Sequence, residues 1–517
     1  MDTVKKTVVS LIAIAALSAC SILTPAPENE ESFAKPPAIY GPLALAAEKF
    51  SPPLAQGDSA FHLLPAARHA LAWRLALIDS AVQSIDAQYY VWKDDEVGAL
   101  VIAHLLEAAD RGVQIRLLVD DMDLATAGTF RNSDHALAAL DYHPNFELRM
   151  FNPGKYRGGT VGALESLGTR FSSYNRRMHN KLFIADNRFA IVGGRNIGNE
   201  YYGLDPEHNF VDLDALVTGA IISDTSDGFD IFWNSSLAYP AKALADADKG
   251  DYENIRRDNQ EFLQKKSELL AAVLPAIDEA KSGINQLPAI MHRGRALFLE
   301  KQPLADADDN HELYDRLNEL AGAGAQEILS STPYLIPVEG FLKLLTEDVE
   351  SGASIRFLTN SLASNNQRTV HSQYKKYRRE ILEAGAELYE LHHKPVGELR
   401  QYIDTPPGKS DTITLHTKAT VIDGKRCFIG TLNLDPRSIE INTEDVMYIE
   451  SEALCNELRN YIAELMLPDN SWQVSTDESG DLLWTSRAGT TTQQPAQKFS
   501  HRVMDFLYGI LPVEKQL

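Results

Sequence analysis

The stretches HNKLFIADNRFAIVGGRN (residues 179–196) and HTKATVIDGKRCFIGTLN (residues 416–433) decide the fold of this 517-residue chain, because they are two copies of one pattern. In both copies the letters H, K, D, G and N fall at spacings of 2, 5, 7 and 3, and the copies lie 237 positions apart. By chance, one such match arises in roughly one in 10^4 chains of this size, so two matches indicate a duplicated chemical site. The repeated positions are His179, Lys181, Asp186, Gly193, Gly194 and Asn196, then His416, Lys418, Asp423, Gly430, Thr431 and Asn433.

The residue types in this pattern favour chemistry at a phosphodiester. Two histidines can divide the roles of nucleophile and proton carrier, because imidazole is half-protonated near neutral pH. A lysine and an asparagine beside each histidine supply hydrogen-bond donors for anionic oxygens. Period-two alternation places His179 with Lys181, and His416 with Lys418, on one side of the chain.

Each copy also predicts a hairpin. An apolar run ends at Asp186 in the first copy and at Asp423 in the second, both turn signals, and another apolar run follows each turn. We therefore interpret these two aspartates as structural. The glycines of the motif serve either close approach to phosphate or tight packing, and Thr431 could add a hydroxyl donor where the first copy has Gly194.

The two motifs resemble those of the phospholipase D superfamily, in which two H-x-K-x4-D copies meet at a pseudo-twofold axis to form one active site. The similarity continues through FVDLD (residues 210–214), FDIFWN (residues 229–234) and DPRS (residues 435–438). Among the branches of the superfamily, the chain is most similar to bacterial cardiolipin synthases, particularly the C type. The resemblance implies a duplicated α/β/α sandwich with two pseudo-twofold related halves that share one active site.

The resemblance also implies roles for the site residues. His179 would form a phosphohistidine, and His416 would protonate the leaving alcohol and then activate the incoming one. The two copies are nearly equivalent, so the reverse assignment stays open. Asp212 and Glu444, downstream of the motifs, would orient the histidines by accepting from the second ring nitrogen. Solvated or capping carboxylates are the alternative for these two acids.

The charge of the chain bears on its partners. The formal net charge is -23, which disfavours nucleic acid unless a local basic patch intervenes. Arg176-Arg177 and the cluster Lys375, Lys376, Arg378 and Arg379 could receive an anionic headgroup, or the latter could form a solvated helix face. No cofactor or metal is indicated, and membrane phospholipids are the expected partners.

The N-terminus predicts a lipid anchor. Lys5 and Lys6 precede a short apolar run that ends in Leu-Ser-Ala-Cys20, and this stretch resembles a bacterial lipoprotein signal. The run is too short to span a bilayer. Cleavage before Cys20 would leave an acylated cysteine that anchors the protein to the cell envelope. Because Ser21 is not aspartate, the sorting rule of Gram-negative lipoproteins favours the outer membrane, with the protein facing the periplasm. An ordinary secretory signal is the alternative.

The rest of the chain divides into segments by composition and periodicity. We expect a signal peptide at residues 1–19, a Pro- and Glu-rich tether at 20–55, phospholipase D-like domains at 56–240 and 311–470, a helical connection at 241–310 and a C-terminal extension at 471–517. Helices are predicted at 69–80, 97–111, 312–321 and 339–351, and strands at 84–92, 114–119, 327–334 and 354–359.

Two further features belong neither to the repeated motif positions nor to the predicted domain boundaries. Residues 501–511 carry an apolar helical stripe that either packs on the second domain or dips into lipid. Cys427 reads as a core thiol, and a disulfide bond with Cys455 is possible.

Three functions remain open from the sequence. The first is transfer of a phosphatidyl group to a second lipid, which gives cardiolipin through a phosphohistidine. The second is hydrolysis of phospholipid to phosphatidic acid. The third is cleavage of nucleic acid by a phosphodiesterase of the same superfamily, which the acidity and the lipid anchor disfavour.

Overall fold

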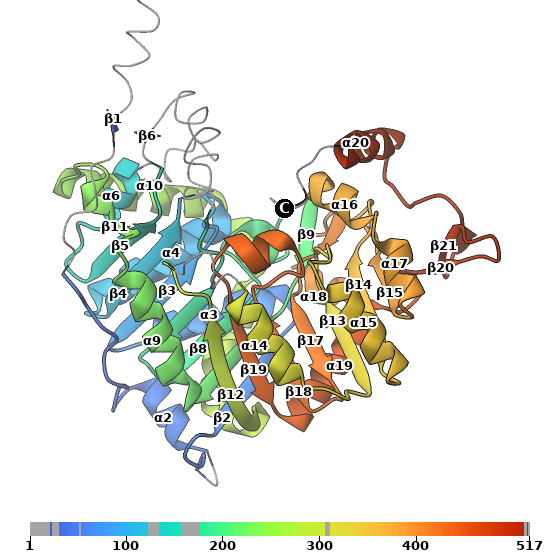
Figure 1. Cartoon of the computed structure of the whole chain (residues 1–517). Helices are drawn as coiled ribbons and strands as arrows, with labels where there is room; N and C mark the ends of the chain where they lie inside the picture. The colour runs from blue at the N-terminus through green and yellow to red at the C-terminus, as the bar shows by residue number, and fades with distance from the viewer. Residues whose placement is uncertain are drawn as a thin grey trace, which may run out of the picture.

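The computed structural model describes residues 21–22, 30–50, 53–121, 134–154, 156–157, 176–304, 311–396, 398–406, 408–510 and 514. Within this part of the chain, the strands of two similar halves join into one long mixed sheet (Figure 1). Cys20 and the predicted signal peptide lie outside the described residues.

The first half supplies eight neighbouring strands of this sheet. From the outer edge to the junction they are β11 (Ala238–Pro240), β5 (Phe146–Phe151), β4 (Gln114–Asp120), β3 (Ser84–Tyr89), β7 (Leu182–Ala185), β8 (Phe189–Gly193), β10 (Asp214–Gly219) and β2 (Ser59–Leu64). β3, β4 and β5 are parallel, and the other neighbours in this half are antiparallel.

The second half repeats the order from the junction outward. Its strands are β12 (His292–Glu300), β19 (Asp445–Glu450), β18 (Arg426–Gly430), β17 (Ala419–Ile422), β13 (Glu327–Ser331), β14 (Ser354–Asn360), β15 (Glu387–Leu391), β20 (Ser471–Thr476), β21 (Leu482–Ser486) and β22 (Gly489–Thr491). β2 and β12 pair antiparallel where the halves meet, so the two motif hairpins, β7–β8 and β17–β18, stand at equivalent places on either side.

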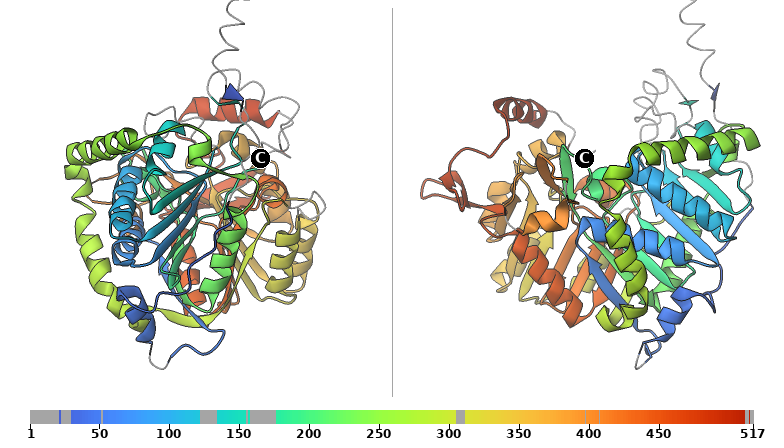
Figure 2. Two further views of the ribbon diagram at one scale, coloured as in Figure 1. Left: turned by 90° about the vertical axis from the view of Figure 1, so that its left-hand side faces the viewer. Right: turned by 180° about the vertical axis from the view of Figure 1, so that it is seen from behind.

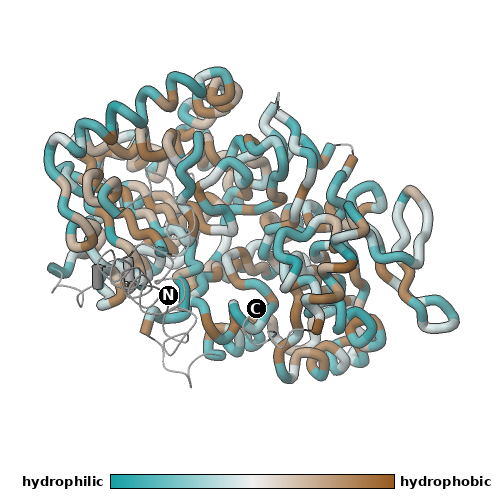
Figure 3. Tube along the Cα trace, turned by 90° about the horizontal axis from the view of Figure 1, so that it is seen from above, coloured by the Kyte–Doolittle hydropathy of each residue, from teal (hydrophilic) through white to brown (hydrophobic). Residues whose placement is uncertain are grey.

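Helices cover both faces of the sheet, as expected for an α/β/α sandwich. One face carries α9 (Ile221–Trp233) and α19 (Glu452–Leu465), whose apolar residues share one core across both halves. The other face carries, in the first half, α2 (Pro42–Glu48), α3 (Ala67–Ser80), α4 (Glu96–Asp110), α6 (Asp134–Leu140), α10 (Lys249–Lys265) and α12 (Leu274–Gly283). In the second half it carries α14 (Glu312–Ala321) and α15 (Phe341–Glu350). Figure 3 shows the apolar segments inside both halves.

The remaining elements are short or lie near the edges. They are β1 (Ser21–Ile22), β6 (Tyr156–Arg157), β9 (His208–Val211), α11 (Ser267–Leu270), α13 (Leu287–Ile290), α16 (Arg368–Tyr374), α17 (Arg378–Glu383), α18 (Leu399–Ile403), β16 (Thr412–Leu415) and α20 (Phe499–Gly509). In Figures 1 and 2, α20 and the β20–β21 arm extend beyond the rest of the second half.

Three predicted boundaries are wrong. The tether ends well before residue 55, because residues 30–50 lie along the first half and α2 buries Leu43 and Ala46 in its core. The connection at 241–310 is not wholly helical, because its last part is β12, the first strand of the second half. The extension from residue 471 begins as β20, an integral strand of the sheet.

Cys427 is not a free core thiol. It lies on β18, and its sulfur is bonded to that of Cys455 on α19, with the two Cα atoms 5.7 Å apart. The bond joins the sheet to the helix that covers it. The structure therefore contains the disulfide bond that the sequence left as an alternative.

Candidate active site

The two motifs meet through backbone contacts that cross between the halves. The amide of His179 donates to the carbonyl of Thr443 at 3.0 Å, and the amide of His416 donates to the carbonyl of Val211 at 2.7 Å. β16, which leads into the second motif, pairs in parallel with β9 of the first half. Each catalytic candidate is therefore positioned by the segment that follows the other motif.

Contacts that cross between the halves also give each histidine a carboxylate partner. Nδ1 of His179 lies 2.7 Å from Oε2 of Glu444, and Nδ1 of His416 lies 2.6 Å from Oδ2 of Asp212. Both carboxylate side chains are fully buried. A carboxylate at Nδ1 favours the imidazole tautomer that carries its hydrogen on Nδ1. Nε2 is then unprotonated and available to the reacting atoms. Asp212 and Glu444 are therefore not solvated or capping residues.

The motif lysines lie beside the histidines. Nζ of Lys181 donates to the carbonyl of His179 at 2.6 Å, and Nζ of Lys418 donates to the carbonyl of His416 at 2.7 Å. Both lysines are almost completely buried. Burial lowers the pKa of Lys181 to about 7. The two buried lysines place hydrogen-bond donors for an anion beside the two imidazoles.

Burial and these charges change the protonation of the site. Burial, and then the charges of Lys181 and Lys418, lower the pKa of His179 well below its usual range. Burial and Lys418 lower the pKa of His416 to about 3, and burial lowers the pKa of Lys418 to about 8. A neutral His179 is nucleophilic at neutral pH. A phosphate between the lysines would offset their charge and let His416 hold a proton.

The motif asparagines also contact the site walls. Oδ1 of Asn196 accepts from the amide of Val91 at 3.0 Å, and its Nδ2 donates to the hydroxyl of Tyr201 at 2.9 Å. Nδ2 of Asn433 donates to the hydroxyl of Ser438 at 3.2 Å. Each Nδ2 carries two hydrogens, of which these bonds use one. Both asparagines are thus held in fixed orientations beside the lysines of their motifs.

The remaining motif residues support the backbone. Carboxylate oxygens of Asp186 accept from the amides of residues 82, 83 and 84, and those of Asp423 accept from the amides of residues 326 and 327. A Cβ on Gly194 would lie 2.2 Å from Oδ1 of Asp212. Added Cβ atoms at Gly193 and Gly430 would also clash with the neighbouring strand. Tight packing, rather than approach to phosphate, thus accounts for these glycines.

The hydroxyl of Thr431 is a donor, as predicted, and its partner in the structure is the backbone of Asp445. The hydroxyl lies 3.2 Å from the carbonyl of Asp445 and accepts from the amide of that residue at 2.9 Å. Thr431 therefore holds the start of β19, directly after Glu444.

Three members of the two basic clusters are engaged with carboxylates of the fold. Arg177 is fully buried and pairs with Asp120 at 3.1 Å. Arg378 is buried and pairs with Glu390, while Lys375 pairs with Asp505. These cations neutralise carboxylates of the fold, so the prediction that they receive a headgroup is wrong for them.

Sequence reasoning missed two aromatic residues of the site. The ring of Tyr90 lies 5.0 Å from that of His179, and the ring of Tyr201 lies 5.4 Å from that of His416, both edge to face. Tyr90 follows β3 and Tyr201 lies five residues after Asn196. Neither belongs to the repeated pattern, and single tyrosines carry no signal of their own.

Comparisons with known proteins agree with this geometry. Residues 75–233 and 317–466 match the family model described as "Cardiolipin synthase, PLD-like domain". The chain is 35% identical to cardiolipin synthase C of Escherichia coli K12 over 463 residues, which cover 86% of this chain and 93% of that protein. It is 31% identical to an uncharacterized protein of Helicobacter pylori 26695 over 80% of each chain. The crystal structure of phosphatidylserine synthase from Haemophilus influenzae Rd KW20 shares the fold, with a TM-score of 0.53 at 14% identity over 78% of this chain and 86% of that one.

Proposed function

The chain belongs to the phospholipase D-like cardiolipin synthase family, and from this premise we propose that it transfers a phosphatidyl group from one phospholipid to another to make cardiolipin. One observation carries the proposal: each motif histidine is held at Nδ1 by a buried carboxylate from the other half. This arrangement gives two oriented imidazoles with different tasks at one site.

The reaction can be written with the residues in place. Nε2 of His179 attacks the phosphorus of the donor lipid and forms a phosphohistidine, while Nε2 of His416 gives its proton to the oxygen of the departing headgroup. His416 then takes the proton of a hydroxyl on the second lipid, whose oxygen attacks the phosphorus and releases His179. Donors of Lys181 and Lys418 match the charge on the phosphate oxygens in both transition states.

Two alternatives share the first step. If water takes the place of the lipid hydroxyl, the product is phosphatidic acid. A nuclease would instead need an extended basic track along a polymer. The chain carries a net charge of -23, and Arg177, Lys375 and Arg378 of the basic clusters are paired with carboxylates. These observations support the lipid substrate.

Product analysis tests the substrate class. With vesicles of phosphatidylethanolamine and phosphatidylglycerol, mass spectrometry should detect cardiolipin or phosphatidic acid, and neither product should form with His179→Ala. The same enzyme concentration should leave single- and double-stranded DNA intact. DNA degradation that requires His179, without a change in any lipid, would refute the lipid assignment.

We also propose that the protein is anchored by lipid at Cys20 in the bacterial cell envelope, at the periplasmic side of the outer membrane. None of the helices in the described ranges has the length and hydropathy to cross a bilayer. Cys20→Ser should leave an unprocessed precursor and abolish incorporation of labelled fatty acid into the protein. Label that survives the substitution would reject the anchor.

The C-terminal helix supports contact with a membrane. Of the residues of α20, only Asp505 is buried, where its carboxylate pairs with His371 at 2.8 Å and with Lys375 at 2.6 Å. Four apolar residues of the helix, namely Phe499, Val503, Phe506 and Leu507, are instead exposed, as is Ile510 directly after it. The alternative in which the apolar stripe packs on the second domain is therefore wrong. An apolar face on a helix with Lys498 and Arg502 beside it suits an anionic lipid surface.

Phe506→Asp tests this contact. Because Phe506 is 64% exposed, the substitution should leave the melting temperature unchanged but lower activity on anionic vesicles by about tenfold. Activity on a short-chain soluble phospholipid should be spared. Leu467→Asp, at a residue with 51% exposure just after α19, is the matched control and should have little effect. Equal losses on vesicles and on soluble substrate would contradict the membrane contact.

A further inference from the structure

A cavity of about 450 Å³ lies in the second half between α14, α15 and the sheet. Its walls are mainly apolar, with Ile328, Phe341, Ile355, Phe357, Phe428 and Leu434 among them. Lys418 is one of the lining residues, so the cavity adjoins the second motif. Ala321 and Gly322 at the end of α14, with Leu344 of α15, line other parts of the wall, and Leu344 is 47% exposed.

The equivalent space in the first half is filled, and the duplication shows why. Ala87 pairs with Phe183 where β3 meets β7, and Ser330 pairs with Thr420 where β13 meets β17. The buried ring of Phe183 thus corresponds to the much smaller Thr420. In the same register, the buried Tyr89 of the first half corresponds to Thr332. Two aromatic side chains are replaced by threonines on the wall of the cavity.

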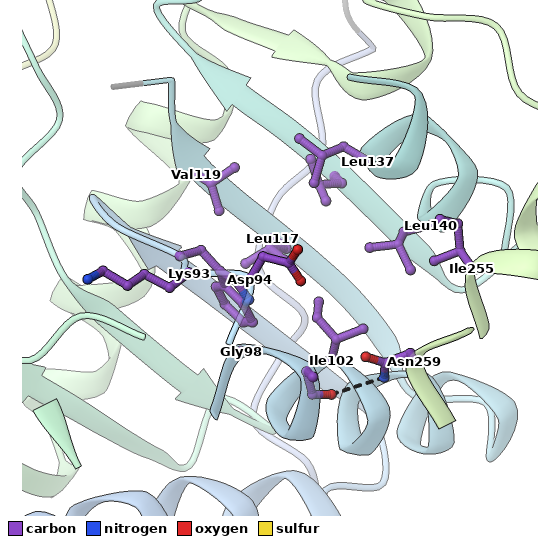
Figure 4. A pocket seen from close by; sticks show the side chains of 13 residues that line it. Lys93, Asp94, Gly98, Ile102, Leu117, Val119, Leu137, Leu140, Ile255 and Asn259 are labelled. Atoms are coloured by element: carbon purple, nitrogen blue, oxygen red, sulfur yellow. Dashed lines mark hydrogen bonds between the residues drawn. The ribbon is translucent and has the colours of Figure 1, made fainter. Parts of the chain in front are cut away.

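The helices that cover the sheet also differ between the halves, because α3 buries more residues than α14 does. α3 buries Leu71, Leu75 and Ile78 in the core of the first half, whereas Leu313 and Leu317 are the buried residues of α14. On this face of the first half, a hollow beside α4 measures only about 40 Å³ (Figure 4). Figure 4 shows Leu117, Leu137, Leu140 and Ile255 among the residues that line it. The first half thus places larger side chains, Phe183 and Tyr89, where the second half has the cavity.

The hydroxyl groups of the cavity are already engaged with the protein. Ser330 and Thr420 share a hydrogen bond at 2.9 Å, and the hydroxyl of Thr332 donates to the carbonyl of Tyr334 at 2.8 Å. Apart from the charged residues Glu347, Asp348 and Lys418, the surface that faces the cavity is therefore suited to hydrocarbon. An empty apolar cavity of this size would cost stability, because its walls lack contacts on one side.

We propose that this cavity binds one acyl chain of the phospholipid whose phosphate is held at Lys418. This inference rests on the proposed function and names a subsite for its substrate. A 150 Å³ apolar cavity accommodates benzene, so about 450 Å³ corresponds to roughly 18 carbon atoms. That is the size of one long acyl chain. The catalytic lysine in its lining holds the head of the same lipid.

The test is a substitution that fills the cavity: Thr420 is replaced by phenylalanine, the residue that the first half has at the equivalent position, Phe183. Thr420→Phe should lower kcat/KM for dioleoyl phosphatidylglycerol by at least about tenfold relative to the wild-type enzyme. For dihexanoyl phosphatidylglycerol, whose chains are too short to fill the cavity, kcat/KM should stay within about twofold. The control Lys343→Phe adds the same side chain at a position on α15 with 79% side-chain exposure, and should change neither value. An unchanged ratio of long-chain to short-chain activity in Thr420→Phe would overturn the inference and leave the proposed function standing.

Photocrosslinking gives a second measurement that needs no turnover. Phosphatidylglycerol with a diazirine near the end of one acyl chain should label peptides of α14 and α15 in the full-length protein, and Thr420→Phe should lose this label. Label confined to other segments, such as α20, would overturn the inference. So would label from a diazirine fatty acid alone, with none from the phospholipid. Label in the cavity of an enzyme that forms neither cardiolipin nor phosphatidic acid would instead reject the proposed function.

Discussion

His179→Ala and His416→Ala should each lower the rate of cardiolipin formation by at least about 10^3-fold, and the double variant should be no less active than either single variant. The reason is that both imidazoles act on one phosphorus atom, so the loss of either one removes a complete step. Chelators should have no effect on the wild-type rate. Mass spectrometry of lipid products measures the rates, and circular dichroism confirms that the variants fold.

The same variants assign the two roles. Phosphohistidine should accumulate in His416→Ala but not in His179→Ala, because the attacking residue survives only in the first. His135→Ala changes a half-exposed histidine on α6 and should retain full activity. Half of the wild-type activity in either single variant would mean that the two motifs form independent sites. Phosphohistidine trapped in His179→Ala alone would reverse the assignment.

Asp212→Asn and Glu444→Gln should each lower turnover by about 10^2- to 10^4-fold without changing the fold. An amide at Nδ1 no longer fixes the tautomer of the histidine and no longer stabilises its cation. Because the carboxylates cross between the halves, Asp212 acts on His416 and Glu444 acts on His179. Glu440→Gln, at a partly exposed acid four residues before Glu444, should have little effect.

An activated substrate separates the two carboxylates. A p-nitrophenyl phosphodiester has a leaving group that departs without a proton, so its first step depends on the nucleophile alone. The burst of p-nitrophenol should be suppressed in Glu444→Gln and largely preserved in Asp212→Asn. The opposite pattern would show that the carboxylates act within their own halves or that the histidine roles are exchanged.

Much of the fold could be predicted from the sequence because local periodicity and the motif repeat agree. The helix expected at 312–321 is α14 with the same ends, and the strands expected at 114–119 and 354–359 are β4 and β14 within one residue. The motif hairpins turn at Asp186 and Asp423, as the turn signals predicted.

The errors have physical causes. β12 was missed because its sequence HRGRALFLE begins with charged residues and the strand is only partly buried, so the alternation is weak. α2 was missed because the segment that contains it is rich in Pro and Glu, which favours a tether. The extended backbone of such a segment can still dock through a few residues. The disulfide bond between Cys427 and Cys455 stayed an open alternative, because the spacing of two cysteines does not show whether their Cα atoms are close.

The sequence predicted most of the residues that form the site, but not which carboxylate contacts which histidine. The repeat identified the histidines, lysines and asparagines, and the resemblance pointed to Asp212 and Glu444. Neither showed that each carboxylate serves the histidine of the opposite half, because that depends on the contacts between residues 265 and 204 positions apart. The cavity beside Lys418 likewise depends on how α14 lies over the sheet.

The exchange of carboxylates between the halves has a consequence for biosynthesis. A ribosome that has completed the first 440 residues has already made both histidines and both lysines, yet His179 still lacks Glu444, and the backbone partner of its amide, Thr443, is also missing. The nascent polypeptide is therefore chemically incomplete until nearly all of its length has been translated. Proteolytic fragments that end before this point share the defect.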